Sequence, residues 1–432
     1  MSNIWINVSD LIVHVKRAKG MRVRGIPRVI LNYAYYGCKN HNFRACIYCN
    51  STSMWYEIDS QVIYDIYNQT NIDKTLSFIK QCYVTHCKHT LCNIVHKYKS
   101  KFDSLAFHAL RHILTFRWLN VGLNPHLKLI SFNGGDVLFN SGLSHHNVAI
   151  FDTIERNKRD LGIKLYSLVH DIIPISNNGE YHAFIYCEQF ARYINRVINA
   201  SDKIFTVSDF TKNEVMKYFK LSTDNIHTVP LGNNIIANGL VGTDVLLSNN
   251  LERKKYIMMV STIEVRKNHI GLVKAWRNIV KNNKNNGCKL VIVGAIGWQI
   301  SEFLQYIKQN AADLDGNFVI LNRIQDRDLS SLYKNCLFTV FPSFMEGYGL
   351  PIVESFMNGK LCITSNVSSM PEVGGEYADY VNPRDISTIE EKISFYINNP
   401  EALAAKEEKI KSAKFSSWEE ATSVLADFIN EK

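Results

Sequence analysis

One stretch, residues 337–366, constrains the fold of this chain more than any other. It opens with the apolar run 337–341, which is short, partly β-branched and ended by Pro342, as is typical of a buried strand in a parallel sheet. A short helical pattern follows and ends at Gly359, and a second apolar run occupies residues 361–364. The stretch therefore predicts a strand, a loop, a helix and a second strand. In such a unit the amino end of the helix faces the carboxyl edge of the sheet, where phosphate-bearing ligands bind.

The loop of this unit, residues 344–350, is suited to contact with a ligand. Gly347 and Gly349 let backbone NH groups come close to a bound molecule, because no Cβ intervenes. Glu346 lies in the loop and Glu354 lies one turn into the helix, so the two carboxylates can reach different parts of one extended ligand, such as a nucleotide sugar. From spacing alone an alternative stays open, in which Glu354 complements the helix dipole and Glu346 is a solvated loop residue.

Length and composition indicate two domains and no membrane span. The chain has 432 residues, of which 46% are hydrophobic, so it can bury sizeable cores. No run of about 18 apolar residues occurs, and the first residues lack a basic segment followed by an apolar core. We therefore expect a cytoplasmic protein whose ten cysteines are reduced and mostly buried.

The net charge of +9 favours acidic partners but does not choose among them. The excess is concentrated between residues 71 and 128, where nine lysines and arginines accompany two aspartates. This region is mostly helical by pattern, so it could rest on an anionic membrane or face a pyrophosphate-linked acceptor; the alternative is an ordinary solvated face. Its Cys and His residues, with Cys46 and Cys49, could be taken for a zinc site. No second C-x-x-C is present, however, and buried thiols with surface histidines are the better interpretation.

Further strands are expected in the first half of the chain. We predict strands at residues 127–132 and 163–169, and we expect the loops that follow them, at 133–136 and at His170, to face a cleft. A histidine at a strand end is more often a structural hydrogen-bonding group than a catalytic one, so its role is open at this point. Ser208 follows another strand and is predicted to cap the next helix.

The second domain is expected after a weakly patterned connection at residues 233–250. A strand at 256–260 leads to two adjacent cations, Arg266 and Lys267, just before an amphipathic helix. Cations are unfavourable at a helix N-terminus unless an anion lies there too, and a diphosphate is the anion that we expect. Surface cations without a partner are the alternative.

Together these motifs resemble the retaining glycosyltransferases of family 4. The resemblance is strongest from Tyr256 to Pro383 and recurs, more thinly, before that range. The matching residues are Gly25, Ile26, Pro27, Arg28 and Val29 of a "TGI-x-RV" segment, in which Arg24 replaces the Thr; His170, Asp171 and Pro174 of an "HD-x-x-P" segment; and residues 261–269 of a "GT-x-E-P-RKN" element, in which Ser261 replaces the Gly and Val265 the Pro. They continue with Pro342, Ser343, Glu346, Gly347, Gly349, Leu350, Pro351 and Glu354 of the "E-x7-E" region, and with residues 368–375 and 415–421.

The resemblance implies an α/β protein of the GT-B fold, with two Rossmann-like domains facing a central cleft. The N-terminal, acceptor-side domain would span residues 1–235 and include the basic helical region 71–128. The nucleotide-sugar-binding domain would span residues 236–414, and a C-terminal helix at 415–432 would cross back onto the first domain.

The resemblance also implies a site in the cleft. In the family the first Glu of the motif lies by the transferred sugar, the second binds the ribose hydroxyls, the His contacts the donor sugar and the basic residues hold the phosphates. Nothing resembles a D-x-D metal site, so neither a metal nor another cofactor is expected. The expected residues are His170, Glu346 and Lys267 for catalysis; Arg266, Lys267, Ile324, Gly347, Tyr348, Gly349, Leu350 and Glu354 for the donor, with the backbone at Ile324 receiving the nucleobase; and Gly25 and Arg28 in an acceptor or phosphate loop.

The implied function is transfer of a hexose from a nucleotide sugar to a growing glycan or lipid-linked saccharide, with retention and without nucleic acid as a partner. GDP-mannose is the expected donor, with dTDP-rhamnose or a UDP-hexose as rivals, and peripheral contact with the inner face of the plasma membrane is an option. A catalytically silent GT-B scaffold protein is the alternative of another class. A sugar-nucleotide epimerase is disfavoured, because its chemistry needs further carboxylates that the sequence does not offer.

Overall fold

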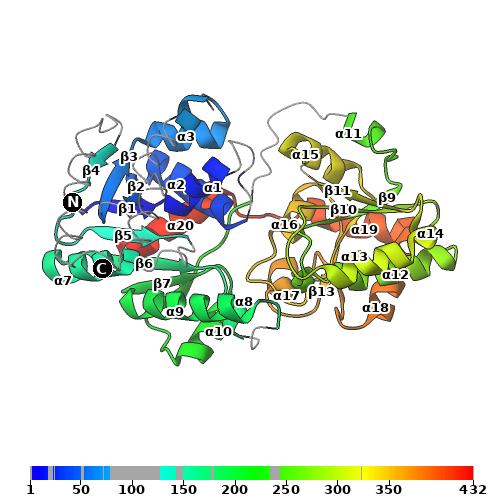
Figure 1. Ribbon diagram of the computed structural model, residues 1–432. Helices are drawn as coiled ribbons and strands as arrows, with labels where there is room; N and C mark the ends of the chain where they lie inside the picture. Colours follow the sequence, from blue (N-terminus) through cyan, green and yellow to red (C-terminus); the bar gives the residue numbers. More distant parts are fainter. Residues whose placement is uncertain are drawn as a thin grey trace, which may run out of the picture.

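The computed structural model shows two α/β domains side by side (Figure 1). It describes residues 2–17, 23, 25–49, 53–71, 73–77, 127–142, 149–176, 180–233, 244–322 and 324–431. Most of the basic region 71–128 lies outside these ranges. None of the helices in the described ranges is long and apolar enough to cross a membrane.

The N-terminal domain is built on an eight-stranded sheet in the order β4-β3-β2-β1-β5-β6-β7-β8. Its strands are parallel except at one edge, where β3 runs antiparallel to both β2 and β4. The strands are β1 (Ile4–Asn7), β2 (Phe43–Cys49), β3 (Met54–Ile58), β4 (Leu127–Leu129), β5 (Val137–Asn140), β6 (Lys164–Val169), β7 (Lys203–Thr206) and β8 (Ile226–Thr228). The helices are α1 (Ser9–Arg17), α2 (Ile26–Asn40), α3 (Ser60–Asn68), α7 (Ala149–Leu161), α8 (Ile173–Ser176), α9 (Phe184–Ala200) and α10 (Asp209–Phe219).

The C-terminal domain is built on a six-stranded parallel sheet in the order β11-β10-β9-β12-β13-β14. The strands are β9 (Tyr256–Val260), β10 (Lys289–Val293), β11 (Phe318–Leu321), β12 (Thr339–Phe341), β13 (Cys362–Ser365) and β14 (Asp379–Val381). The helices are α11 (Asp244–Leu247), α12 (His269–Lys281), α13 (Ser301–Gln309), α14 (Ala311–Leu314), α15 (Asp326–Asn335), α16 (Leu350–Met357), α17 (Met370–Gly374), α18 (Ile386–Asn398) and α19 (Pro400–Lys411), with a 3-10 turn at Val265–Lys267.

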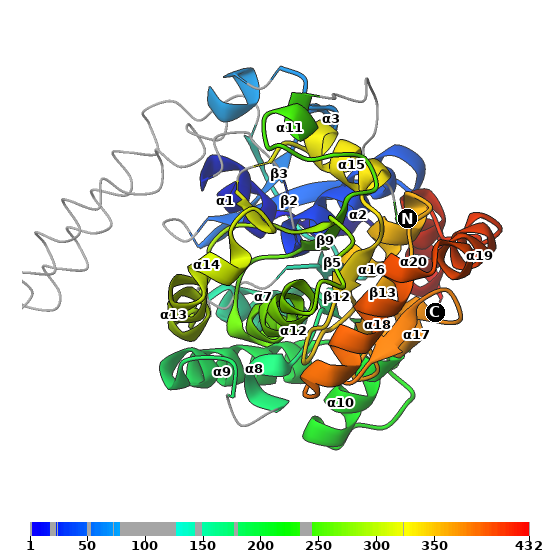
Figure 2. The same ribbon diagram turned by 90° about the vertical axis from the view of Figure 1, so that its right-hand side faces the viewer.

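Helices cover both faces of each sheet, as expected where the central strands are buried on both sides. In β10, Leu290 and Ile292 join the core beneath α12 and α18, whereas Val291 and Val293 join a second core with residues of α11 and α15. Figure 2 shows the C-terminal domain in front, with α12 and α18 lying over its sheet. The alternation places one helical layer on each face, which is the Rossmann-like arrangement.

The helix α20 (Trp418–Asn430) follows the C-terminal domain in sequence but packs on the N-terminal domain, where it is drawn in red beside α2 (Figure 1). Its first residue, Trp418, is fully buried and makes an edge-to-face contact with Tyr33 of α2, with ring centroids 5.5 Å apart. Gly232 lies so close that a Cβ built there would be 2.2 Å from the Trp418 Cα. The two domains are therefore joined by two crossings of the chain.

Much of the predicted element pattern is confirmed, including β6, β9, β13 and α10 with its Ser208 cap, whose hydroxyl accepts from the Thr211 NH. The prediction that residues 133–136 face the cleft is wrong. These residues precede β5 and lie at the amino edge of the sheet, where Asp136 accepts hydrogen bonds from the Asn3 NH and the Trp5 indole NH. The carboxylate therefore ties two neighbouring strands together at the edge opposite the carboxyl ends.

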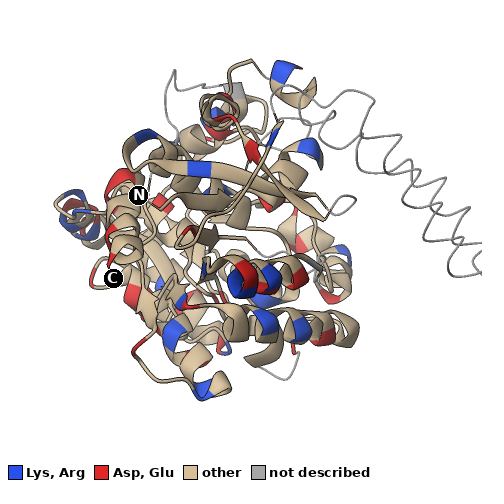
Figure 3. Cartoon of the chain, turned by 90° about the vertical axis from the view of Figure 1, so that its left-hand side faces the viewer, with Lys and Arg blue, Asp and Glu red and all other residues tan. Residues whose placement is uncertain are grey.

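Charge on the described part of the N-terminal domain is mixed. Figure 3, which views the molecule from that side, shows Lys and Arg interspersed with Asp and Glu over the helices. On α7, for example, Asp152 and Glu155 both pair with Arg196 of α9.

Candidate active site

A cleft with a volume of about 450 Å³ lies between the two domains. The N-terminal domain contributes the start of α2, the end of α3 and the loop after β6. The C-terminal domain contributes the loops after β9, β10 and β12 and the helices α15 and α16. The predicted site residues that line it are Gly25, Arg28, His170, Arg266, Lys267, Glu346, Gly347, Tyr348, Gly349, Leu350 and Glu354.

The glycines of the loop after β12 are required by its geometry. Gly349 has a φ of 112° and lies at the N-cap of α16, a conformation that favours glycine. Gly347 is in close contact with the other domain, because a Cβ there would lie 2.2 Å from the His170 carbonyl oxygen. The loop can therefore approach the cleft and the N-terminal domain at the same time.

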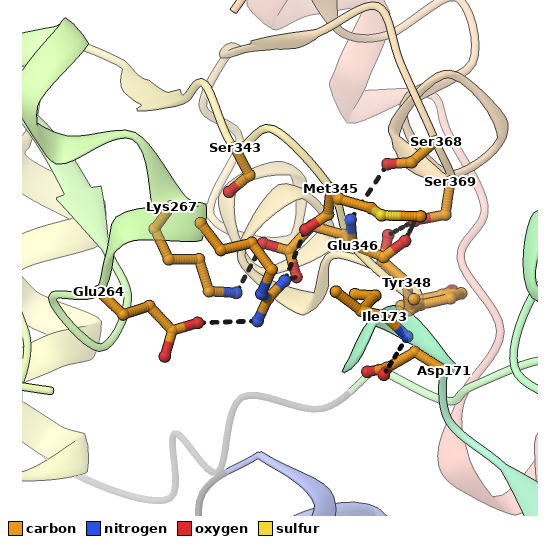
Figure 4. A network of polar contacts seen from close by, with 12 residues as sticks. Asp171, Ile173, Glu264, Lys267, Ser343, Met345, Glu346, Tyr348, Ser368 and Ser369 are labelled. Carbon is orange, nitrogen blue, oxygen red and sulfur yellow. Dashed lines mark hydrogen bonds and ion pairs between the residues drawn. The ribbon is translucent and has the colours of Figure 1, made fainter. Parts of the chain in front are cut away.

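Glu346 lines the cleft and is held by two cations that line it too, Arg266 and Lys267. Figure 4 shows Lys267 and Glu346 in this cluster. The Lys267 ammonium donates to Glu346 Oε1 at 2.6 Å, and the Arg266 guanidinium donates to Oε2 at 2.7 Å. Arg266 also donates to Glu264 at 2.8 Å. Two carboxylates and two cations thus form one buried cluster in which the charges balance.

The cluster keeps Glu346 ionised. Burial alone would raise its pKa, but the charges of Arg266 and Lys267 outweigh that effect and lower the pKa of Glu346 to about 2. Burial lowers the pKa of Lys267, and the neighbouring Arg266 adds to this effect. Glu346 is therefore an anion at neutral pH, and it carries no proton that it could donate to a ligand.

Glu354 is held from both domains. Arg28 of α2 forms an ion pair with Glu354 Oε1, and the hydroxyl of Tyr333 on α15 donates to Oε2 at 2.9 Å. The Arg28 and Glu354 side chains are 21% and 12% exposed, so this interdomain pair is largely shielded from water. The structure thus brings the predicted acceptor-loop residue and the predicted ribose residue into contact.

His170 is buried at the end of β6, and its Nε2 lies 2.8 Å from the Ser141 carbonyl oxygen. Burial lowers the pKa of His170, which makes the neutral ring the stable form. A neutral ring beside a carbonyl acceptor must carry its proton on Nε2, so Nδ1 remains as the acceptor. This fixes which ring atom can interact with a ligand.

Ile324, which was expected to receive the nucleobase, does not itself line the cleft. It is half-buried and packs in the same small core as Leu329, which lines the cleft.

The cysteines considered for zinc lie partly outside the described ranges. Cys46 is fully buried and donates to the Ile6 carbonyl, whereas residues 82–96 are not described. Within the described ranges, no group of three or more His, Cys, Asp or Glu residues could hold a metal ion.

Sequence reasoning did not assign Glu264 or Tyr333 to the site. Glu264 stands two residues before Arg266, so its position in the same short run was a usable signal. Tyr333 lies on the buried face of an amphipathic helix and is 1% exposed, as a core residue would be. Its contact with Glu354 depends on how α15 packs beside α16, and a helical pattern carries no information on that.

Comparison with known proteins agrees with this architecture. Residues 248–413 match the family model "Glycosyl transferases group 1". The whole chain superposes on the crystal structure of Anabaena HepE in complex with UDP and glucose, with a TM-score of 0.64, 10% identity and 100% of each chain covered. A glycosyltransferase from Rickettsia africae gives a TM-score of 0.61 at 15% identity and covers 99% of this chain and 97% of its own. These findings support a glycosyltransferase of the GT-B fold.

Sequence relatives of this GT-B protein include mannosyltransferases. O-antigen chain mannosyltransferase B of Escherichia coli is 29% identical over 257 residues, which is 59% of this chain and 66% of that protein. The serotype-specific mannosyltransferase WbdA of Escherichia coli is 25% identical over 240 residues, which is 52% of this chain. The matches span 28% of WbdA and just under two thirds of the first relative. The predicted GT-B fold with two Rossmann-like domains is confirmed.

Proposed function

We propose that this protein transfers mannose from GDP-mannose to a glycan acceptor, with retention at the anomeric carbon and without a metal ion. The observation that carries the proposal is the buried Glu346, paired with Arg266 and Lys267 in a cleft between two Rossmann-like domains. Such a cleft offers cations for a diphosphate and a permanent anion beside it. The mannosyltransferase names of the relatives support the choice of sugar.

Different residues of the site would bind different parts of the donor. Arg266 and Lys267 would bind the diphosphate, because charge-assisted hydrogen bonds to phosphate are strong. Glu354 would accept hydrogen bonds from the ribose hydroxyls. Glu346 would lie by the hexose, where its negative charge stabilises the positive charge that develops at the anomeric carbon.

The proposed reaction needs no separate base. The bond between the anomeric carbon and the diphosphate oxygen breaks, and the acceptor oxygen forms its bond to carbon on the same face. The acceptor proton passes to the departing phosphate oxygen, so GDP leaves with it. Lys267 and Arg266 would stabilise the charge of the leaving group, and Glu346 would remain ionised throughout because the pKa of its carboxyl is about 2.

The cleft also offers a reason to prefer guanine. Asp326, at the start of α15, lines the same cleft as Leu329 and Tyr333. A carboxylate accepts hydrogen bonds, and guanine presents two adjacent NH donors on one edge, whereas uracil and thymine present one NH between two carbonyl oxygens. With the nucleobase placed beside the start of α15, the Asp326 carboxylate would therefore favour GDP over UDP or dTDP.

The test is a donor screen with GDP-mannose, dTDP-rhamnose and UDP-hexoses, with and without glycan acceptors and with and without EDTA. We expect hydrolysis and transfer from GDP-mannose that EDTA does not change, and a product whose anomeric configuration by NMR matches that of the donor. Inversion would overturn the mechanism, and a preference for another donor would overturn the choice of sugar. GDP binding without any turnover would favour the scaffold alternative.

We further propose that the basic region 71–128 brings the protein to anionic lipid at the cytoplasmic membrane face, where a lipid-linked saccharide would be the acceptor. Reversal of Lys97, Lys99 and Lys101 to Glu should reduce sedimentation with anionic liposomes and leave hydrolysis of GDP-mannose unchanged. The control is liposomes of neutral lipid. Equal sedimentation of the variant and the wild type with anionic liposomes would contradict the membrane role.

A further inference from the structure

The backbone of the loop after β12 is held at three successive carbonyl groups. Two of the three are satisfied within the C-terminal domain, because the Ser369 hydroxyl donates to the carbonyls of Glu346 at 3.0 Å and Tyr348 at 2.8 Å. The Glu346 NH donates to the Ser368 hydroxyl at 3.1 Å (Figure 4). These bonds fix both sides of Gly347 but leave its own carbonyl to another partner.

The Gly347 carbonyl is satisfied by the opposite domain. It accepts from the Ser208 hydroxyl at 2.6 Å and from the Thr211 hydroxyl at 3.1 Å. Ser208 is the N-cap of α10, and both of these side chains are buried, with exposures of 0% and 1%. A buried carbonyl that loses its partners is costly, so this peptide group is at its most stable only when the domains are in contact.

A second attachment joins α17 of the C-terminal domain to the same end of α10. The carboxylate of Glu372 accepts from the Asp209 NH at 2.8 Å and from the Phe210 NH at 3.0 Å. These are free NH groups of the first turn of α10, which ordinarily need a cap or water. Glu372 lies on α17, the helix that begins directly after Ser369. The loop that carries Glu346 and the helix α17 therefore dock as one unit on the N-terminus of α10.

We propose that Ser208 and Thr211 are positioning residues for Glu346, and that Glu372 anchors them, so that contact between the domains completes the reactive geometry of the loop. The inference rests on the proposed function, because Glu346 is taken as the residue beside the transferred hexose. It assigns to the N-terminal domain a part in setting the donor site, beyond presenting the acceptor.

Thr211→Val is the decisive variant. It removes the hydroxyl with little change of shape and leaves the Ser208 cap of α10 in place. We expect the turnover of GDP-mannose to fall about tenfold, which corresponds to the loss of one hydrogen bond. We expect the Kd of GDP, measured by calorimetry, to stay within about twofold, because Arg266 and Lys267 belong to the C-terminal domain. Thr211→Ser should restore turnover.

Asp385→Ala is the matched control. Asp385 caps α18 by accepting from the Ser387 NH, is far from α10 in sequence and touches no residue of the cleft loop among the contacts described. It should lower stability slightly and leave turnover unchanged. The proposal is overturned if Thr211→Val turns over like the wild type, if Asp385→Ala loses as much activity, or if the Kd of GDP rises in step with the loss of turnover.

A second readout does not depend on activity. Amide hydrogen exchange at residues 344–350 should be faster in Thr211→Val, and in Glu372→Gln, than in the wild type, whereas exchange in β9 and β10 should not change. Unchanged exchange in the loop would overturn the positioning role even if no donor were turned over. Failure of the wild type to use any nucleotide sugar, with faster loop exchange in the variants, would instead overturn the proposed function alone.

Discussion

Glu346 forms ion pairs with two buried cations, Arg266 and Lys267, and this determines what its removal should do. Glu346→Gln should lower turnover by about 100-fold or more, the scale for losing one electrostatic stabiliser of a transition state. GDP should bind at least as tightly as to the wild type, because Lys267 and Arg266 lose an anion that competes for them. Steady-state kinetics and calorimetry test both parts. Normal turnover would remove Glu346 from the reaction.

The effect of Glu346→Gln on the free energy of unfolding should depend on pH, and the pKa of Glu346 gives the direction of this dependence. The pKa of Glu346 lies at about 2, below its ordinary value of 4.5, so the ionised group contributes stability above pH 4.5 that is lost as pH falls towards 2. Breaking a buried ion pair costs about 3 to 5 kcal/mol. The deficit of Glu346→Gln in urea unfolding should therefore be largest near neutral pH and narrow below pH 4.5. A deficit that widened in acid would contradict the ion pairs.

Lys267 is expected to act on the diphosphate. Lys267→Ala should weaken GDP binding by about 1.5 to 3 kcal/mol, the range for a hydrogen bond to a charged group. GMP should be affected much less, because it lacks the second phosphate. Equal losses for the two nucleotides in calorimetry would place Lys267 away from the diphosphate.

Most individual residues of the site could be predicted from the sequence, but their partners could not. Glu346, Arg266 and Lys267 stand in motifs whose residue types indicate their chemistry. Arg28 and Glu354 are 326 positions apart in the sequence, so no local sequence pattern could reveal that they pair. It depends on how two separately folded domains meet.

At the scale of elements, the strand β5 shows where pattern reading fails. Its four residues, Val137–Asn140, are all buried and central in the sheet, but they are too few to show a period. The glycine pair before them looked like a loop at the carboxyl end of a preceding strand. The preceding strand is in fact the short edge strand β4, and Asp136 anchors the turn at the opposite edge.

The contact between α2 and α16 yields a prediction for the donor. Arg28→Ala should raise the Kd of GDP-mannose about three- to tenfold, because Glu354 keeps Tyr333 but loses its charged partner. A donor with 2′-deoxyribose should be less sensitive to the change, since it offers Glu354 one hydroxyl fewer. Arg28→Lys should recover part of the loss. Equal losses for the two donors would show that Arg28 does not act through Glu354.

At the scale of the whole molecule, α20 fastens the N-terminal domain. Trp418→Ala should destabilise that domain by about 3 to 5 kcal/mol, because it leaves a cavity beside Tyr33 and Gly232. Limited proteolysis should then cut the N-terminal domain first and spare residues 256–381. The exposed variant Val424→Ala, on the same helix, is the control and should behave as the wild type. Equal resistance in both variants would contradict the fastening role.

The overall architecture was accessible from the sequence because parallel strands followed by ligand loops recur in both halves of the chain. The contacts between the two domains could not be predicted from the sequence. Gly347 illustrates the reason, since its place in a glycine-containing loop was clear, but its close approach to the His170 carbonyl belongs to the meeting of the two domains.

The return of α20 to the first domain also bears on how the protein is made. During synthesis, residues of the N-terminal sheet leave the ribosome early, whereas Trp418, Leu425 and Ile429, which complete the core on one face of that sheet, leave it only after the entire C-terminal domain. Until then the face formed by α2 and its neighbours is exposed and apolar. A hydrophobic surface of the nascent N-terminal domain therefore stays exposed until α20 has been synthesised. Chaperone binding to this domain is most favourable during that interval.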